Sequence, residues 1–178
     1  MTPKTQASVD FREAVFELSK TMPFARDFIN SGRLSQPYQY IGSSLVSEDD
    51  ISFCSDGILP GQSILDAPIF IGRKQTWLID QITIGFSLVA FVDEEKTAIS
   101  ITKYLDEVCR QLDLVEQYLV VTSKRLNGRS TKFLCDTSGL AFERWAASDG
   151  TIYLVRPDHH IAARWKATPT ISVLKKAY

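Results

Sequence analysis

The sequence predicts an α/β domain, with a central mixed sheet flanked by helices, that is preceded by an N-terminal helical appendage. Apolar runs of strand length alternate with amphipathic helical stretches from residue 47 onward. Two short apolar runs near the C-terminus lie close enough together to form a hairpin. Residues 1–46, by contrast, show helical spacing followed by a stretch without any period. We therefore expect two segments, 1–46 and 47–178.

Composition places the chain among ordinary globular proteins and excludes several classes. Of its 178 residues, 44% are hydrophobic and 23% are charged, which is typical of such proteins. Lys and Arg number 20 against 21 Asp and Glu, so we expect no nucleic-acid partner. The apolar run 86–92 is far shorter than the ~20 residues of a membrane span, and the N-terminus lacks the apolar core of a signal peptide. We expect a cytoplasmic protein that does not engage a membrane.

The N-terminal segment predicts two helices with an apolar face. Phe11, Val15, Leu18 and Met22 recur at helical spacing, and Asp10 followed by Glu13 resembles a capping box. Pro23 can then open a second helix that ends at residues 30–32 and carries two more apolar residues on one face, Phe24 and Phe28. Two helices cannot bury such a face by themselves. It must pack on the rest of the chain, on a second copy or on something absent from this chain.

The second segment predicts seven elements after a loop marked by Pro and Gly. The first three expected elements are a strand at 86–92, a helix at 97–114 and a strand at 117–123; the buried stripe of the helix consists of Ile101, Leu105, Val108 and Leu112. A short helix then starts near Asp136 or Ser138, with Leu140 and Trp145 facing inward. Strands at 150–156 and 161–167 follow, and then a closing helix capped by Thr168 with Pro169 as its first residue. A β-α-β crossover followed by a hairpin and a closing helix is the element order of the thioredoxin fold.

Three stretches of the chain carry a resemblance to a known family. They are "ARDFINSGRLSQPYQYIGSSL" (25–45), "PGQSILDAPI" (60–69) and "CDTSGLAFERWAASDGTIYLVRPDHHIAARW" (135–165). Together they resemble the C-terminal third of FAD-dependent aromatic-ring hydroxylases, flavoprotein monooxygenases of the phenol hydroxylase and 3-(3-hydroxyphenyl)propionate hydroxylase type. The resemblance implies a thioredoxin-like C-terminal domain, preceded by the helical tail of the parent enzyme's middle domain and a connector.

The family's flavin-binding motifs do not occur in this chain. Neither G-x-G-x-x-G nor G-D-A-x-H is present, and the two histidines lie at 159 and 160. The resemblance therefore implies that the parent enzyme uses FAD, NAD(P)H and oxygen to hydroxylate a phenolic ring, while this chain contains no catalytic, cofactor-binding or metal-binding residue. We expect it to contribute to stability and dimer assembly. Its expected partners are the FAD- and substrate-binding domains of the parent enzyme and a second copy of itself.

A second hypothesis, that the chain is a stand-alone thioredoxin- or peroxiredoxin-like thiol protein, depends on its cysteines. A redox thioredoxin needs a thiolate at the helix N-terminus after its central strand, but residues 93–97 contain no cysteine. We expect Cys109 and Cys135 to pack in or near the core, and Cys54 to be a free thiol that could be exposed and reactive. A third possibility is a separate module that binds and regulates a flavoprotein encoded elsewhere.

The C-terminal hairpin contains the remaining candidate residues. The sequence "PDHH" (157–160) has His159 where the family has Gly, so we expect an exposed turn with His159 in the left-handed region rather than an interaction surface or a metal site. Arg156 and Arg164 could pair with Asp158 or Asp136, or could contact the parent enzyme's other domains. The candidate interaction residues of the chain are thus Phe11, Val15, Leu18, Phe24, Phe28, Arg156 and Arg164.

Overall fold

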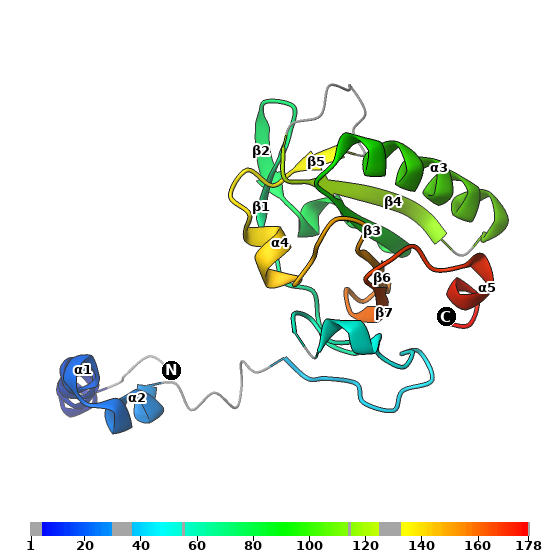
Figure 1. The fold of residues 1–178 in the computed structure, drawn as a ribbon. Coiled ribbons are helices and arrows are strands. Elements are labelled where there is room, and N and C mark those ends of the chain that lie inside the picture. Colours follow the sequence, from blue (N-terminus) through cyan, green and yellow to red (C-terminus); the bar gives the residue numbers. More distant parts are fainter. Residues whose placement is uncertain (1–4, 30–36, 55, 114, 125–132, 178) are drawn as a thin grey trace. The chain divides into compact units, whose positions relative to one another are not determined.

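The computed structural model describes residues 5–29, 37–54, 56–113, 115–124 and 133–177. The chain divides into two compact units, residues 1–37 and residues 38–178. Figure 1 shows the helices of the first unit and the sheet domain of the second. Each unit is described by itself below.

The first unit consists of α1 (Gln6–Thr21) and α2 (Pro23–Ile29). Helix α1 begins four residues before the predicted capping box, because the Thr5 side chain accepts a hydrogen bond from the Ser8 amide and caps the helix there. Asp10 is a helical residue that accepts from the Gln6 side chain, so the prediction of a start at Asp10 was wrong. Pro23 opens α2 as predicted. The predicted helix end at 30–32 lies outside the described residues.

The second unit is built on a mixed sheet, which has seven strands among the described residues (Figure 1). Their spatial order is β2-β1-β5-β4-β3-β6-β7. The strands are β1 (Pro68–Ile71), β2 (Lys74–Trp77), β3 (Phe86–Val92), β4 (Val115–Thr122), β5 (Phe133–Cys135), β6 (Ile152–Val155) and β7 (Ile161–Trp165). Strands β3, β4 and β5 run parallel, and the hairpins β1–β2 and β6–β7 flank them in antiparallel pairing.

The predicted strands at 86–92, 117–123, 150–156 and 161–167 are present, but β1, β2 and β5 were missed by the sequence reasoning. Strand β5 has three residues, which is too few for a period to show. Strand β2 is an exposed edge strand with the polar sequence KQTW. The hairpin turn at Gly72, which has φ +59°, was the signal that could have revealed β1 and β2.

Side chains of β3 point alternately into two separate cores, one on each face of the sheet. Val89 and Phe91 pack with Trp145 and Tyr153 on one face. Leu88, Ala90 and Val92 belong to the core on the other face, together with residues of α3 (Glu95–Gln111) and α5 (Ile171–Leu174). Burial on both faces confirms the prediction that 86–92 is a covered central strand.

The helices of the second unit match the prediction in order and differ at their ends. All four residues of the predicted α3 stripe are buried: Ile101, Leu105, Val108 and Leu112. Helix α4 (Leu140–Arg144) follows Gly139, and the Asp136 carboxylate accepts hydrogen bonds from its first-turn amides. Trp145 is buried as predicted, whereas Leu140 is only partly buried.

Helix α5 begins two residues later than predicted. Its N-cap is Thr170, not Thr168, and Pro169 belongs to the preceding segment. The carbonyl of Pro169 accepts a hydrogen bond of 2.7 Å from the Tyr104 hydroxyl on α3. This tertiary contact fixes Pro169 outside the helix, and sequence propensity alone could not reveal it.

Candidate functional site

The N-terminus of α3 is the position at which a thioredoxin-like domain would hold a redox thiolate. Here it holds a carboxylate instead. Asp149 accepts hydrogen bonds from the Asp93 amide (2.7 Å), the Glu94 amide (3.2 Å) and the Thr97 hydroxyl (2.7 Å). Burial by itself raises the pKa of Asp149, but these three hydrogen bonds favour the ionised form and lower the pKa overall. A carboxylate of the same domain therefore lies beside the start of α3, bound to the two residues that precede the helix and to the Thr97 side chain.

None of the three cysteines forms a disulfide bond, and none of them lies in the β3–α3 junction. Cys109 is partly buried in the core beneath α3, and Cys135 is buried at the end of β5, as predicted. The sheet register places Cys135 level with Thr122, and Thr122 level with Val92, so two strand spacings separate Cys135 from β3. Cys54 is exposed at the end of a short 3-10 helix, η1 (Ile51–Phe53). Its reactivity stays a prediction.

The histidine pair lies in the β6–β7 turn, as predicted. His159 has φ 60°, the left-handed conformation expected where the turn favours Gly. Both histidines are partly buried rather than exposed. The His160 ring packs edge-on against the Tyr40 ring, with centroids 5.0 Å apart. Within the described residues there is no group of His, Cys, Asp or Glu suited to a metal ion.

The two candidate arginines have different environments. Arg156 donates to Asp158 at 2.7 Å, which is one of the two predicted pairings. A second nitrogen of its guanidinium, Nη1, is buried without a hydrogen-bond partner. Arg164 pairs with Asp49, so its predicted pairing with Asp158 or Asp136 was wrong. Its guanidinium has no exposed surface with which to contact another domain.

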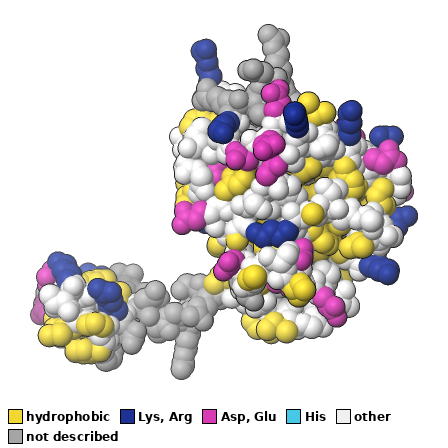
Figure 2. All heavy atoms as spheres, viewed as in Figure 1, with side chains coloured by type: hydrophobic (Ala, Val, Ile, Leu, Met, Phe, Trp, Pro, Cys, Tyr) yellow, Lys and Arg dark blue, Asp and Glu magenta, His cyan; other side chains and the backbone are white. Residues whose placement is uncertain are grey.

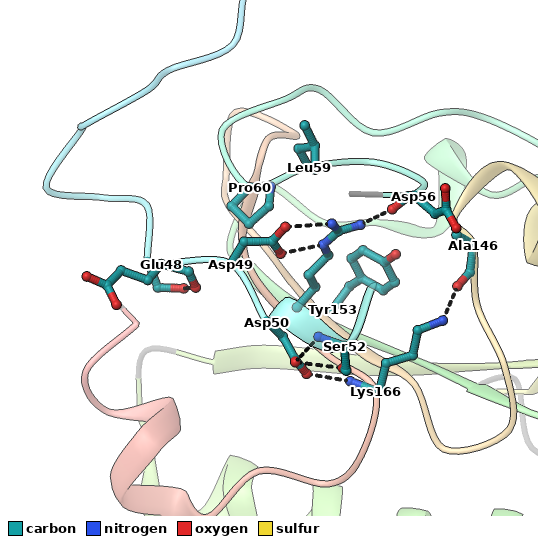
Figure 3. Close-up of polar contacts among 12 residues, drawn as sticks. Glu48, Asp49, Asp50, Ser52, Asp56, Leu59, Pro60, Ala146, Tyr153 and Lys166 are labelled. Carbon is teal, nitrogen blue, oxygen red and sulfur yellow. Dashed lines mark hydrogen bonds and ion pairs between the residues drawn. The ribbon is translucent and has the colours of Figure 1, made fainter. Parts of the chain in front are cut away.

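Arg164 is buried and is the centre of a polar cluster. Figure 3 shows Asp49, Asp56 and Tyr153 of this cluster. Its Nε and Nη2 atoms each donate to the Asp49 carboxylate at 2.7 Å, and Nη1 donates to the Asp56 carbonyl. The guanidinium carbon lies 4.0 Å from the centre of the Phe53 ring. Burial by itself lowers the pKa of Arg164, but the bidentate pair with Asp49 and the hydroxyl of Tyr153 raise it overall. Arg164 is thus fully charged and held in a fixed position.

A neighbouring residue extends the cluster along β7. The Asp50 carboxylate accepts from the Lys166 amide at 3.1 Å and from the Ser52 amide and hydroxyl. Burial raises the pKa of Asp50, but these hydrogen bonds and the nearby Arg164 charge lower it overall. Sequence reasoning missed Asp49 and Asp50, because about 115 residues separate them from their partners. The acidic run at 48–50 was the only signal, and it does not indicate a partner.

The remaining candidates lie on the helical unit, and their apolar side chains are largely exposed. Phe11 is 68% exposed, Phe24 59% and Leu18 43%, whereas Val15 is partly buried. Phe28 lies in α2, but its side chain is outside what the structure describes. Figure 2 shows hydrophobic side chains gathered on the visible face of this unit. Helix α1 has no buried residue, so an apolar surface remains uncovered in the isolated unit.

No helix in the described ranges is long and apolar enough to cross a membrane. No family model matches the sequence, and no curated protein matches it significantly.

Comparison with solved structures shows that the second unit has a thioredoxin-like fold. The thioredoxin domain of a thiol-disulfide oxidoreductase from Bacteroides vulgatus matches 65% of this chain with a TM-score of 0.50 and 15% identity, over 96% of its own length. Thiol peroxidase from Chromobacterium violaceum matches 80% of this chain with a TM-score of 0.56 and 10% identity, over 94% of its own length. The predicted fold class is confirmed.

FAD-dependent hydroxylases are also among the similar structures. The flavin-dependent monooxygenase PieE, solved with FAD and substrate, matches 92% of this chain with a TM-score of 0.57 and 18% identity. The match covers 28% of PieE, so this chain spans about a quarter of the length of such a hydroxylase. At these identities the likeness establishes the fold alone.

Proposed function

We propose that this chain is the redox-inactive, thioredoxin-like C-terminal part of an FAD-dependent aromatic hydroxylase. It serves stability and dimer assembly, and the flavin chemistry belongs to the FAD- and substrate-binding domains of the parent enzyme. The parent enzyme takes NAD(P)H and oxygen and hydroxylates a phenolic ring. The observation that carries the proposal is the Asp149 carboxylate at the N-terminus of α3, with no cysteine in residues 93–97.

This observation argues against thiol chemistry for a physical reason. A catalytic cysteine needs a positive environment that lowers its thiol pKa. At α3 the positive helix end is already neutralised by Asp149, and Asp93, Glu94 and Glu95 add further negative charge. A thiolate placed here would be destabilised by four carboxylates.

The extent of the structural likeness supports the hydroxylase relation. The PieE and RebC matches extend over 92% and 98% of this chain and the match to aklavinone-11 hydroxylase over 79%, whereas the two thiol proteins match 80% and 65%. A match of 92% must include part of the helical unit, because residues 1–37 form more than 8% of the 178 residues. The sequence resemblance at 25–45, 60–69 and 135–165 is an independent support.

The exposed apolar face of α1 and α2 supports an assembly role. Phe11, Leu18 and Phe24 present large hydrophobic side chains that two helices cannot bury. In the proposed enzyme this face packs on the flavin-containing part or on a second copy of the chain. Either partner removes apolar surface from water at about 25 cal/mol per Å² buried.

The test is to isolate the natural assembly that contains this chain under native conditions and to record its visible spectrum. We expect a flavin band from the assembly, and a colourless sample from the purified 178-residue chain alone. A stoichiometric flavin band from the chain by itself would overturn the accessory role. A flavin-free natural assembly would overturn the hydroxylase relation.

A thiol protein is the second candidate, favoured by the likeness to thiol peroxidase and by the exposed Cys54. It requires a thiolate of low pKa, so alkylation at about pH 6 should be fast in the wild type and absent in Cys54→Ser. We expect instead slow alkylation in the wild type, at the rate of an ordinary thiol. Fast alkylation together with thiol-dependent peroxide reduction would replace the hydroxylase proposal.

A further inference from the structure

Strand β7 lies at one end of the sheet, where an uncovered strand would leave a row of unpaired backbone groups. Two segments cover this edge. The loop at 61–62 exchanges hydrogen bonds with Ile161, from the Gly61 amide to its carbonyl (2.8 Å) and from its amide to the Gln62 carbonyl (2.9 Å). The connector adds the Ser47 amide, which donates to the Ala162 carbonyl at 2.9 Å.

The connector segment 47–54, called the strap below, is fastened to β7 by few contacts. Asp49 forms the bidentate pair with Arg164, and Asp50 accepts from the Lys166 amide (Figure 3). Phe53 is 1% exposed and lies edge-on to Tyr153, with ring centroids 5.8 Å apart. The strap is thus held to the sheet by one ion pair, by the packing of one aromatic ring and by a few hydrogen bonds.

The rest of the strap faces solvent. Ile51 is 93% exposed, and Glu48 and Cys54 are exposed as well. Strand β3, by contrast, is buried on both faces and paired along both edges. Segments with few buried contacts open at a lower free energy than such central strands. The strap therefore has the properties of a separate opening unit.

We propose that the strap is a latched cover of the β7 edge, which opens independently of the sheet and whose latch is the Arg164–Asp49 pair. Opening exposes Phe53 and the part of the β7 edge that the strap covers.

Amide hydrogen exchange on the full chain tests the proposal. In the wild type, the Ser47 and Lys166 amides should exchange through an opening that is more frequent than the one that exposes the β3 amides. In Asp49→Asn, protection of Ser47 and Lys166 should fall by roughly tenfold to a hundredfold, because Arg164 loses its charged partner. The β3 amides exchange through global unfolding, which also breaks the pair, so their protection should fall by no more than the same factor and should stay above that of the strap.

Asp158→Asn is the matched control, because it removes the same charge from an arginine pair at the exposed hairpin turn. It should leave Ser47 and Lys166 protection unchanged. Equal exchange free energies for the strap and β3 in the wild type would overturn the proposal, and so would unchanged protection of Ser47 and Lys166 in Asp49→Asn. Should Asp49→Asn not fold, the wild-type comparison and the milder Asp50→Asn, which weakens the contact with the Lys166 amide, decide the question.

Discussion

Carboxylates beside helix starts account for much of the local order of the sheet domain. Asp136 is 1% exposed and holds the first turn of α4, and Asp149 holds that of α3. Asp136 accepts from first-turn amides that the helix leaves without partners, whereas Asp149 accepts from the amides of the two residues before α3 and from the Thr97 hydroxyl. In both cases the carboxylate lies outside the helix in sequence, and for Asp149 it is more than 50 residues away.

Replacing Asp149 by Ala should destabilise the fold by about 1 kcal/mol at neutral pH, because it removes the hydrogen bonds that join Asp149 to the start of α3. The folded-state pKa of Asp149 is lowered, so its contribution is fully present above the unfolded pKa of about 3.9 and is lost as the pH falls through the folded value. Urea unfolding of the wild type and Asp149→Ala at several pH values measures this. The difference should close in acid, and Asp113→Ala, an exposed Asp beyond α3, should give no such difference.

Gly61 shows a second constraint at the residue scale. Its φ is +84°, and a Cβ at this position would lie 2.8 Å from the Tyr40 carbonyl oxygen. Pro and Gly mark this loop in the sequence. The structure shows why the glycine is needed: two backbone segments approach closely there, and a side chain would not fit. This approach holds the connector beside the loop that covers β7.

At the element scale, the helical unit is the part of the molecule with the least burial of its own. Among the described side chains of α2, Ala25 is the buried one, and α1 has none. Helix formation was predictable from spacing, because apolar residues recur every three or four positions. The position of the N-cap was not predictable, because Thr5 and Asp10 are both good N-cap residues and only the geometry distinguishes them.

The purified chain should self-associate through the apolar face of the helical unit. Phe11→Asp places a charge on this face and should shift the chain toward monomer in sedimentation at about 100 µM, because it removes buried apolar area and adds a charge to be desolvated. Phe28→Asp should act in the same direction. Ser8→Asp makes the same charge change at an exposed polar position of α1 and should have no effect. A chain that is strictly monomeric with and without these substitutions contradicts the prediction.

On the scale of the whole molecule, each of the two cores contains a tyrosine whose hydroxyl is tied to a distant carbonyl. Tyr153 donates to the Trp145 carbonyl on one face, and Tyr104 donates to the Pro169 carbonyl on the other. Burial raises the pKa of each hydroxyl to about 12. For Tyr153 the neighbouring Arg164 charge opposes this rise and Asp49 adds to it.

These two tyrosines should make the fold sensitive to alkali. Their contribution is fully present below the unfolded pKa of about 10 and is lost as the pH rises through the folded value of about 12. Stability measured by urea unfolding should therefore decline from about pH 10 upward. Tyr104→Phe and Tyr153→Phe should each flatten part of this decline, whereas Tyr38→Phe, at an exposed tyrosine, should not. An unchanged pH profile in both core variants would falsify this assignment.

The sequence by itself determined the elements whose signal is local. The covered run 86–92, the stripe of α3, the hairpin with its turn at His159 and the absence of a cysteine at the α3 start all follow from periodicity or from residue identity. Only the tertiary structure decided which distant groups meet: Arg164 with Asp49, Asp149 with α3, and Tyr104 with Pro169. Such pairs form because the sheet brings remote segments together. The local pattern of a single sequence does not show which residues far apart in the chain lie close together in space.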